Sequence, residues 1–309
     1  MTKSKAARNG DALYKAFIYV VLITFAITIV VPVGWAFMAS VKENSEFYGN
    51  PWALPQGLHF QNFADAFQKA NMGAYFFNSV LVTALALAIL LVVALPAAYV
   101  LARYKFRGRK VLNVAFMGGL FINVNYIVVP IFLMLVDGNK WIANLLDRLH
   151  VEEGSLVDRL LGDGIFLNNH FFLALIYAST ALPFTIYLLS SYFQTLPKDY
   201  EEAAYVDGSG YFNTMVKIIM PMAKPSIITV ILFNFLSFWN EYIIAMTLMS
   251  GDSQTLPVGL MNLMKAQNAA AQYGQMYAGL VIVMLPTLIL YIAVQRQLTQ
   301  GMTVGGIKG

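Results

Sequence analysis

Six long apolar stretches constrain this chain more than any other feature of its sequence. The hydrocarbon core of a bilayer is about 30 Å thick, and an α-helix needs roughly 20 mostly apolar residues to cross it. Apolar residues fill 59% of the 309 positions and charged residues only 12%, whereas soluble domains carry about 25% charged residues. The alternation of period two that marks membrane β-barrels is absent. The sequence therefore predicts an all-α integral membrane protein, a six-helix bundle with spans at residues 16–39, 75–100, 112–136, 171–193, 226–249 and 278–294.

The loop charges predict the orientation of these spans. Residues 16–39 are too long for the core of a signal peptide, and no A-x-A cleavage site follows them before Lys42, so we expect a retained anchor. Cytoplasmic segments carry an excess of Lys and Arg, and placing both termini inside assigns most of the 20 basic residues to inner segments. We therefore expect cytoplasmic tails at 1–15 and 302–309, flanking a membrane domain at 16–301.

Residues 194–225 form the long loop on the predicted inner side. Thr195 and Pro197 favour a helix start, and acidic residues follow where the helix dipole favours them. Gly208 and Gly210 permit the positive φ that ends a helix. A second amphipathic helix is expected next, stopped by proline. Its apolar face would hold Phe212, Met215, Val216 and Ile219, with Pro221 and Pro225 at its end.

Two interpretations of this helix–turn–helix compete. It could rest on the membrane surface, as many amphipathic helices do, or it could dock a soluble partner. Helices on the inner leaflet favour Lys and Arg on their polar face, but here four acidic residues outnumber three lysines. Small alanines beside a glycine turn also allow another protein to approach closely. The residues alone favour docking slightly.

The sequence E-A-A-x-x-D-G at residues 202–208, with Pro221 downstream, resembles the cytoplasmic motif of binding-protein-dependent ABC importer permeases. The segments LPAAYVLARYKFRGRK, FWNEY, TLPVGL and QRQLTQGMTVGGIKG are similar to the carbohydrate, maltose-permease-like branch, so the resemblance covers nearly the whole chain. The leucine that the family carries before the proline is Met220 here. The resemblance implies a type I permease fold with an ATPase-coupling helix, and coupling residues Glu202, Ala203, Ala204, Asp207, Gly208, Ile218 and Pro221.

The resemblance also implies partners and a location. We expect a second, homologous permease subunit, two ATPase subunits, an extracytoplasmic solute-binding protein and a sugar or oligosaccharide substrate, with no nucleic acid. ATP and Mg²⁺ would bind to the ATPase subunits, so this chain would hold no cofactor and would not be an enzyme. The location would be the cytoplasmic membrane of a bacterial cell.

The residues themselves support no nucleotide, metal or catalytic site. Gly301 and Gly306 have the spacing of a phosphate loop, but Ile307 and Lys308 follow instead of Lys and Ser/Thr, and no strand precedes them. These glycines predict a flexible tail, which the resemblance would also bring to the ATPase. The chain has no cysteine, and its three histidines fall in outer loops without metal-binding spacing.

Polar residues within the spans are candidates for the substrate path. Glu241 is the one acidic or basic residue well inside a predicted span, where a lone carboxylate costs about 2.5–3.5 kcal/mol. It could line the path, or it could be a hydrogen-bonded link to a neighbouring helix; both interpretations stay open. The outer loop 137–170, with an expected helix at 141–150, could contact the solute-binding protein or be decoration. The path candidates are Asn234, Asn240, Glu241 and Tyr242.

Two other classes of function fit the sequence less well. An ion-coupled secondary transporter usually has internal repeats and midplane charged groups, and we find no convincing repeat and one off-centre carboxylate. An intramembrane enzyme would need a nucleophile with its base, or a metal cluster, in the spans, and these contain no His or Cys. The permease is the preferred prediction, with the secondary transporter as the alternative.

Overall fold

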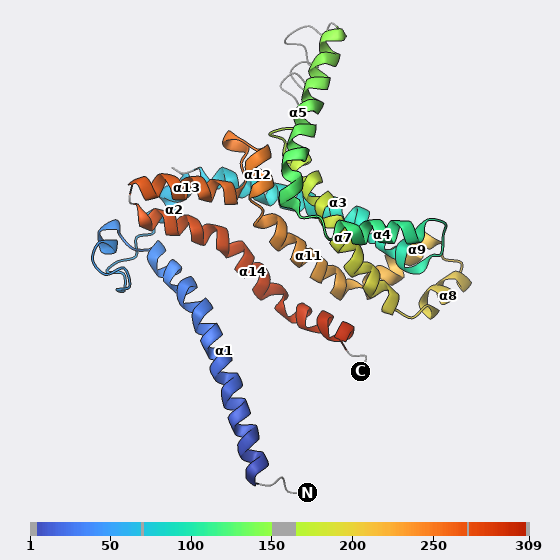
Figure 1. Ribbon diagram of the computed structural model, residues 1–309, viewed down its shortest axis with the longest axis horizontal. Helices are drawn as coiled ribbons and strands as arrows, with labels where there is room; N and C mark the ends of the chain where they lie inside the picture. Colours follow the sequence, from blue (N-terminus) through green and yellow to red (C-terminus); the bar gives the residue numbers. More distant parts are fainter. Residues whose placement is uncertain (1–4, 69–70, 150–164, 271, 307–309) are drawn as a thin grey trace. The chain divides into compact units, whose positions relative to one another are not determined.

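The computed structural model describes residues 5–68, 71–149, 165–270 and 272–306, which form helices and no strand (Figure 1). The chain divides into two compact units, residues 1–70 with 262–282 and residues 71–261 with 283–309. The longer helices are α1 (Lys5–Ser40), α2 (Gln61–Gln68), α3 (Met72–Arg103), α4 (Arg109–Gly119), α5 (Val124–Arg148), α7 (His170–Thr195), α8 (Asp199–Val206), α11 (Lys224–Trp239), α12 (Ile243–Leu248), α13 (Leu256–Ala270) and α14 (Tyr273–Gly306).

Four of the six expected spans coincide with single helices. Residues 16–39, 75–100, 171–193 and 278–294 lie within α1, α3, α7 and α14, each long and apolar enough to cross a membrane. α14 continues to Gly306, so residues 302–306, expected to belong to a flexible tail, are helical instead. Residues 307–309 lie outside the described residues.

The expected third span, 112–136, is divided between α4 and α5. Two glycines of low helix propensity end α4, and the Asn123 side chain then caps α5 by accepting a hydrogen bond from Asn125 N (2.9 Å). A Cβ on Gly119 would lie 2.7 Å from Cγ of Pro183, so glycine lets α4 reach α7. The helix able to cross the membrane is therefore Val124–Arg148. It includes most of the helix expected at 141–150, and residues 150–164 of the outer loop lie outside the described residues.

The expected fifth span, 226–249, is also divided. α11 ends at Trp239, residues 240–242 are not helical, and α12 begins at Ile243. At the other end of α11, the helical stretch Tyr211–Met222 meets Lys224–Trp239 at an angle of 79°. An average of hydropathy over this region conceals both breaks, because the apolar content continues through them.

The core of the larger unit lies where α3 packs along α7 (Figure 1). Ala86, Ala94 and Ala98 of α3 are fully buried, and such small residues let membrane helices approach closely. Leu173 and Leu189 of α7 are equally buried in this core. α11 contacts both helices, so α3 and α7 form the scaffold on which the rest of this unit is assembled.

In the smaller unit, a side chain of α2 donates hydrogen bonds to backbone carbonyls at the end of α1 and just after it. The Asn62 Nδ2 amide donates to the carbonyls of Ser40 (3.0 Å) and Lys42 (2.8 Å). Lys42 is buried, and its ammonium donates to the carbonyl of Pro51 at 2.7 Å. A Cβ on Gly274 would lie 2.6 Å from the Lys42 carbonyl, so glycine is required at the start of α14.

Candidate coupling and transport sites

The first helix of the inner loop, α8, begins later than the sequence predicts. Thr195 Oγ1 donates to the Tyr192 carbonyl (2.8 Å) within α7, so the expected helix start at Thr195 and Pro197 is wrong. Lys198 occupies the N-cap position and α8 runs over Asp199–Val206. The expected concentration of acidic residues in the first turn is confirmed, since three of them lie there. This placement suits the positive end of the helix dipole.

The turn after α8 depends on one glycine. Asp207 is the C-cap of α8, and Gly208 has φ of +79°, a conformation that other residues adopt at a cost. A Cβ on Gly208 would meet nothing within 4 Å, so the backbone angle alone favours glycine here. Gly210 has φ of −74°, so the positive φ expected for it is wrong.

The predicted coupling residues do not share one face. Glu202, Ala203 and Asp207 are exposed together with Gly208, whereas Ala204 is buried in this chain. Downstream, Pro221 is exposed and Ile218 is half-buried. The surface open to a partner is thus formed by Glu202, Ala203, Asp207 and Gly208, which we call the elbow face.

The second helix of the loop differs from its prediction in two ways. Residues 211–222 form a continuous helical stretch with a π-helical turn at Met215–Ile219. Met215 and Ile219 are buried, but Phe212 is 74% exposed and Val216 is also exposed, so the expected single apolar face is wrong.

Proline does not end this stretch as expected. Pro221 lacks an N–H and its ring would press on the carbonyl four residues earlier. The π turn precedes this point, with Met220 N–H bonded to Met215 O, and the helix continues to Met222. Pro225 lies in the first turn of α11, where proline is tolerated. The two helical stretches therefore meet at Ala223 without either proline acting as a stop.

A buried ion pair that sequence reasoning missed connects α8 to α3. Nε of Arg103, the last residue of α3, lies 3.0 Å from Oε1 of Glu201, and the two side chains are only 4% and 10% exposed. Arg103 Nη2 also donates to the Pro197 carbonyl at 3.2 Å. A separation of 98 positions conceals this pair from pattern analysis. The sequence Arg-Tyr-Lys at the end of α3 was visible as a basic segment. Nothing in it indicated that Glu201 is the partner of Arg103.

Tyrosines surround this ion pair. The Tyr104 hydroxyl is 2.7 Å from that of Tyr205 and 3.3 Å from that of Tyr99. The Tyr211 ring lies 5.7 Å from the Tyr104 ring and 5.3 Å from the Tyr205 ring, both edge-on. Burial, and to a smaller extent the hydrogen bond with Tyr104, raises the pKa of Tyr205 to about 12. Its hydroxyl therefore stays protonated at neutral pH and remains able to donate.

Among the predicted path residues, Glu241 lies at the break between α11 and α12. Its carboxylate accepts hydrogen bonds from the backbone N–H groups of Ile244 (2.7 Å) and Ala245 (3.0 Å) and from the Tyr177 hydroxyl of α7 (2.6 Å). Helix N-termini leave N–H groups without partners and favour negative charge. The carboxylate thus caps the N-terminus of α12 and links it to α7.

Glu241 also lines a small cavity with polar groups from three helices. The cavity has a volume of about 240 Å³, and its polar lining includes Asn125, Thr180, Ser237 and Glu241. Thr180 and Ser237 were not predicted; the position of Ser237, one helical turn before Glu241, was the available signal. Hydroxyl, amide and carboxylate groups converging on one space are what binding sites for polar solutes contain.

The other three path candidates do not line this cavity. Asn234 is buried and donates to Thr185 Oγ1 (3.0 Å) and to the Val230 carbonyl (2.8 Å), which joins α11 to α7. Asn240 is exposed and donates to the Leu236 carbonyl of its own helix. The Tyr242 hydroxyl donates to the Met246 sulfur. Their contacts in this chain are those of helix packing and helix ends.

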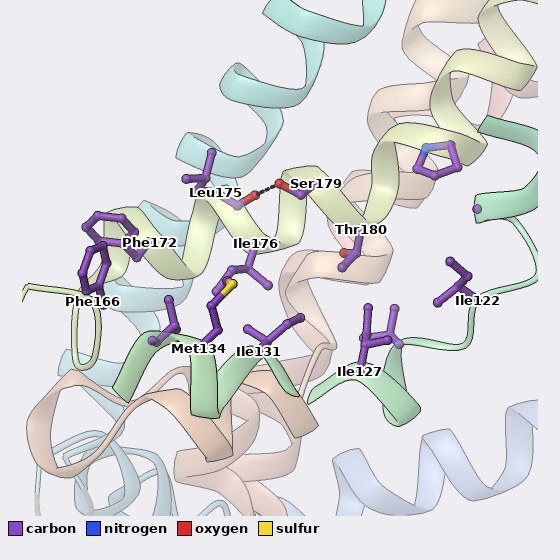
Figure 2. Close-up of a pocket in the computed structure, with 14 residues that line it drawn as sticks. Ile122, Ile127, Ile131, Met134, Phe166, Phe172, Leu175, Ile176, Ser179 and Thr180 are labelled. Atoms are coloured by element: carbon purple, nitrogen blue, oxygen red, sulfur yellow. Dashed lines mark hydrogen bonds between the residues drawn. The ribbon is translucent and has the colours of Figure 1, made fainter. Parts of the chain in front are cut away.

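A larger cavity of about 460 Å³ lies between α5 and α7, and its lining is apolar (Figure 2). Ser179 Oγ donates to the Leu175 carbonyl and Thr180 Oγ1 to the Tyr177 carbonyl. Because both hydroxyls bond within their own helix, the cavity presents hydrocarbon from residues such as Ile131, Met134 and Phe172. A sugar would lose its hydrogen bonds to water there without replacement, so this cavity does not suit a sugar.

Comparisons with known proteins agree with this arrangement. Residues 94–304 match the family described as binding-protein-dependent transport system inner membrane component. The chain is similar to the diacetylchitobiose uptake system permease protein NgcG of Streptomyces coelicolor, with 31% identity over 99% of this chain and 93% of that protein. The permease protein DasC of the same organism's diacetylchitobiose uptake system is 28% identical over 94% of this chain and 96% of its own length. The same fold occurs in a bacterial ABC transporter involved in the import of the acidic polysaccharide alginate (TM-score 0.73, 23% identity, 96% of this chain and 99% of that chain).

Proposed function

This chain belongs to the family of binding-protein-dependent transport system inner membrane components, and from that premise we propose that it is a permease of an ATP-driven oligosaccharide importer. It is a multi-pass membrane protein and a transport subunit. Membership in this family argues against the ion-coupled secondary transporter that its sequence composition left open.

The elbow face is the observation that carries this proposal. An acidic, alanine-bearing surface beside a glycine turn is exposed on the loop expected to lie in the cytoplasm. An ATPase subunit can drive the permease only if it binds this surface differently before and after ATP hydrolysis, because equal binding shifts no equilibrium. In the proposed complex, Glu202 meets a basic or amide group and Ala203 allows close approach. Two ATPase subunits, a second permease and a solute-binding protein complete the assembly, and both termini are cytoplasmic.

The substrate class rests on the relatives and on the cavity beside Glu241. Two relatives are named for diacetylchitobiose, an amino-sugar disaccharide. The amide of Asn125 and the hydroxyl of Ser237 are of the kinds that bond to sugar hydroxyls. The cavity of about 240 Å³ would hold one sugar ring rather than a chain, so it suits a subsite along a path.

The test of orientation uses the absence of cysteine from this chain. Ala203→Cys on the elbow face and Ser45→Cys in the first loop are both exposed. In intact cells a membrane-impermeant thiol reagent should modify Ser45→Cys and should reach Ala203→Cys only after the membrane is opened. Modification of Ala203→Cys in intact cells would refute the proposed orientation.

The test of function uses the complex purified from its native membrane. We expect an ATPase and a second permease to copurify, and vesicles containing ATP and the solute-binding protein to accumulate radiolabelled diacetylchitobiose or a related oligosaccharide. Glu202→Lys should lower ATPase recovery more than about tenfold through like-charge repulsion with the partner. Asp199→Lys, the same charge reversal on an exposed residue outside the motif, should lower it much less. Solute uptake by the purified chain without any ATPase would refute the proposal.

A further inference from the structure

The two acidic residues at 201 and 202 have opposite environments. Glu202 is exposed on the elbow face, whereas Glu201 points into the chain and meets Arg103 at 3.0 Å. The guanidinium of Arg103 also binds the Pro197 carbonyl, just before α8. One arginine at the end of α3 therefore holds both the start of α8 and a side chain of its first turn.

Short non-helical segments join α8 to its neighbours along the chain. After α8 the chain passes through Gly208 in the left-handed region, a residue with no side chain to pack. Before α8 a short segment without helical hydrogen bonds joins it to α7. The contacts of Arg103 add a direct link between α8 and the end of α3 to these chain connections.

The tyrosines extend the same connection. Tyr104, next to Arg103, bonds to Tyr205 of α8, and both rings contact Tyr211 at the start of the second loop helix. Tyr99 of α3 joins the group from the other side. The inner end of α3 is thus bonded to α8 by one buried ion pair and by a chain of hydroxyls.

We propose that Arg103 and Glu201 form a joint, the α3–α8 joint, that makes α8 and the inner end of α3 move as one body when the ATPase acts on the elbow face. This inference rests on the proposed function. Because α3 packs along α7 and contacts α11, displacement of its inner end moves the scaffold of the larger unit. Glu202 makes the outward contact, and Glu201 transmits the resulting movement. Separating a buried ion pair leaves an uncompensated buried charge and is therefore costly. The α3–α8 joint consequently resists separation of the two helices.

The first experiment separates ATP hydrolysis from transport in the purified complex. Glu201→Gln keeps the shape of the side chain and removes its charge. We expect it to retain bound ATPase and ATP hydrolysis, and to lower solute uptake per ATP more than about fivefold. Arg107→Gln removes an exposed charge near Arg103 and serves as the matched control, with an unchanged ratio. A wild-type ratio in Glu201→Gln would overturn the joint.

The second experiment restores the joint covalently. The doubly substituted chain Arg103→Cys with Glu201→Cys contains the only two thiols, because the sequence has no cysteine. It should transport poorly until a flexible bifunctional thiol reagent bridges the two positions, and bridging should then raise uptake per ATP several-fold. A purely structural role in folding would not respond to a bridge added after assembly, so unchanged uptake after bridging would overturn the inference.

Amide hydrogen exchange of the full-length chain tests the joint without any ATPase. Glu201→Gln should raise the exchange rates of residues 201–206 more than about tenfold, whereas Arg107→Gln should not. Unchanged rates would overturn the joint even if transport fell. Absence of ATP-dependent uptake by the unaltered complex would instead overturn the proposed function, so the two failures are distinguishable.

Discussion

Replacement of Glu241 by alanine should loosen the start of α12. The substitution removes the acceptor for the N–H groups of Ile244 and Ala245, and it leaves the Tyr177 hydroxyl, on a side chain only 1% exposed, without its carboxylate. Loss of an N-terminal cap costs about 0.5–2 kcal/mol, and loss of a hydrogen bond to a charged group costs about 1.5–3 kcal/mol. Together these give roughly 2–5 kcal/mol against the closed first turn.

Amide hydrogen exchange measures this quantity directly. Since about 1.4 kcal/mol corresponds to a factor of ten, exchange of residues 244–246 should accelerate roughly 30-fold to several thousand-fold in the Glu241→Ala chain. Glu241→Gln keeps one carbonyl oxygen as an acceptor and should show a smaller increase. Asn240→Ala is the matched control, because the Asn240 side chain is exposed and donates to the Leu236 carbonyl of α11 rather than to α12. Exchange in Glu241→Ala equal to that of the control would refute the capping role of the carboxylate.

Three further predictions concern the inner loop, α13 and the first loop. Gly208→Val should cost about 1–2 kcal/mol because its φ is +79° and should uncouple transport from ATP hydrolysis in vesicles, whereas Gly210→Val, at φ −74°, should do so far less. A Cβ at position 259 would clash with the Tyr75 ring. Gly259→Val should therefore lower the free energy of unfolding in detergent by about 1–3 kcal/mol, and Gly259→Ala should lower it by less. Backbone hydrogen bonds lower the pKa of Glu46, so its stabilisation of the first loop is present above the ordinary carboxyl pKa. The amide protection factors of residues 43–56, taken relative to the intrinsic exchange rate at each pH, should fall as the pH falls below about 4.

Apolar runs were sufficient to predict the helices that pass without interruption, because burial in lipid requires one continuous helical segment and little else. They failed where a local capping group divides a run. Asn123 starts α5 and Glu241 starts α12, and both lie in segments whose average hydropathy stays high. Thr195 misled for a related reason, since its hydroxyl bonds backward into α7 and a capping pattern does not specify which helix is capped.

The motif E-A-A-x-x-D-G was visible in the sequence, but its division into an exposed and a buried part was not. Spacing placed Ala203 and Ala204 together, whereas the structure exposes the first and buries the second. That outcome depends on what packs against α8, which is the helical stretch starting at Tyr211 together with the side chain of Arg103. Arg103 and Glu201 come from distant parts of the chain, and no local pattern brings an arginine and a glutamate of such separation together.

The hydrogen bond between Tyr177 and Glu241 has a consequence for biogenesis. Tyr177 precedes Glu241 in the chain, so the segment that supplies the hydroxyl leaves the ribosome and enters the bilayer before the segment that needs it. When residues 240–242 emerge, the donor that shields their carboxylate from hydrocarbon is already in place. A circularly permuted chain that synthesised α11 and α12 first would present an unaccompanied carboxylate to the insertion machinery, and its yield in the membrane should be lower.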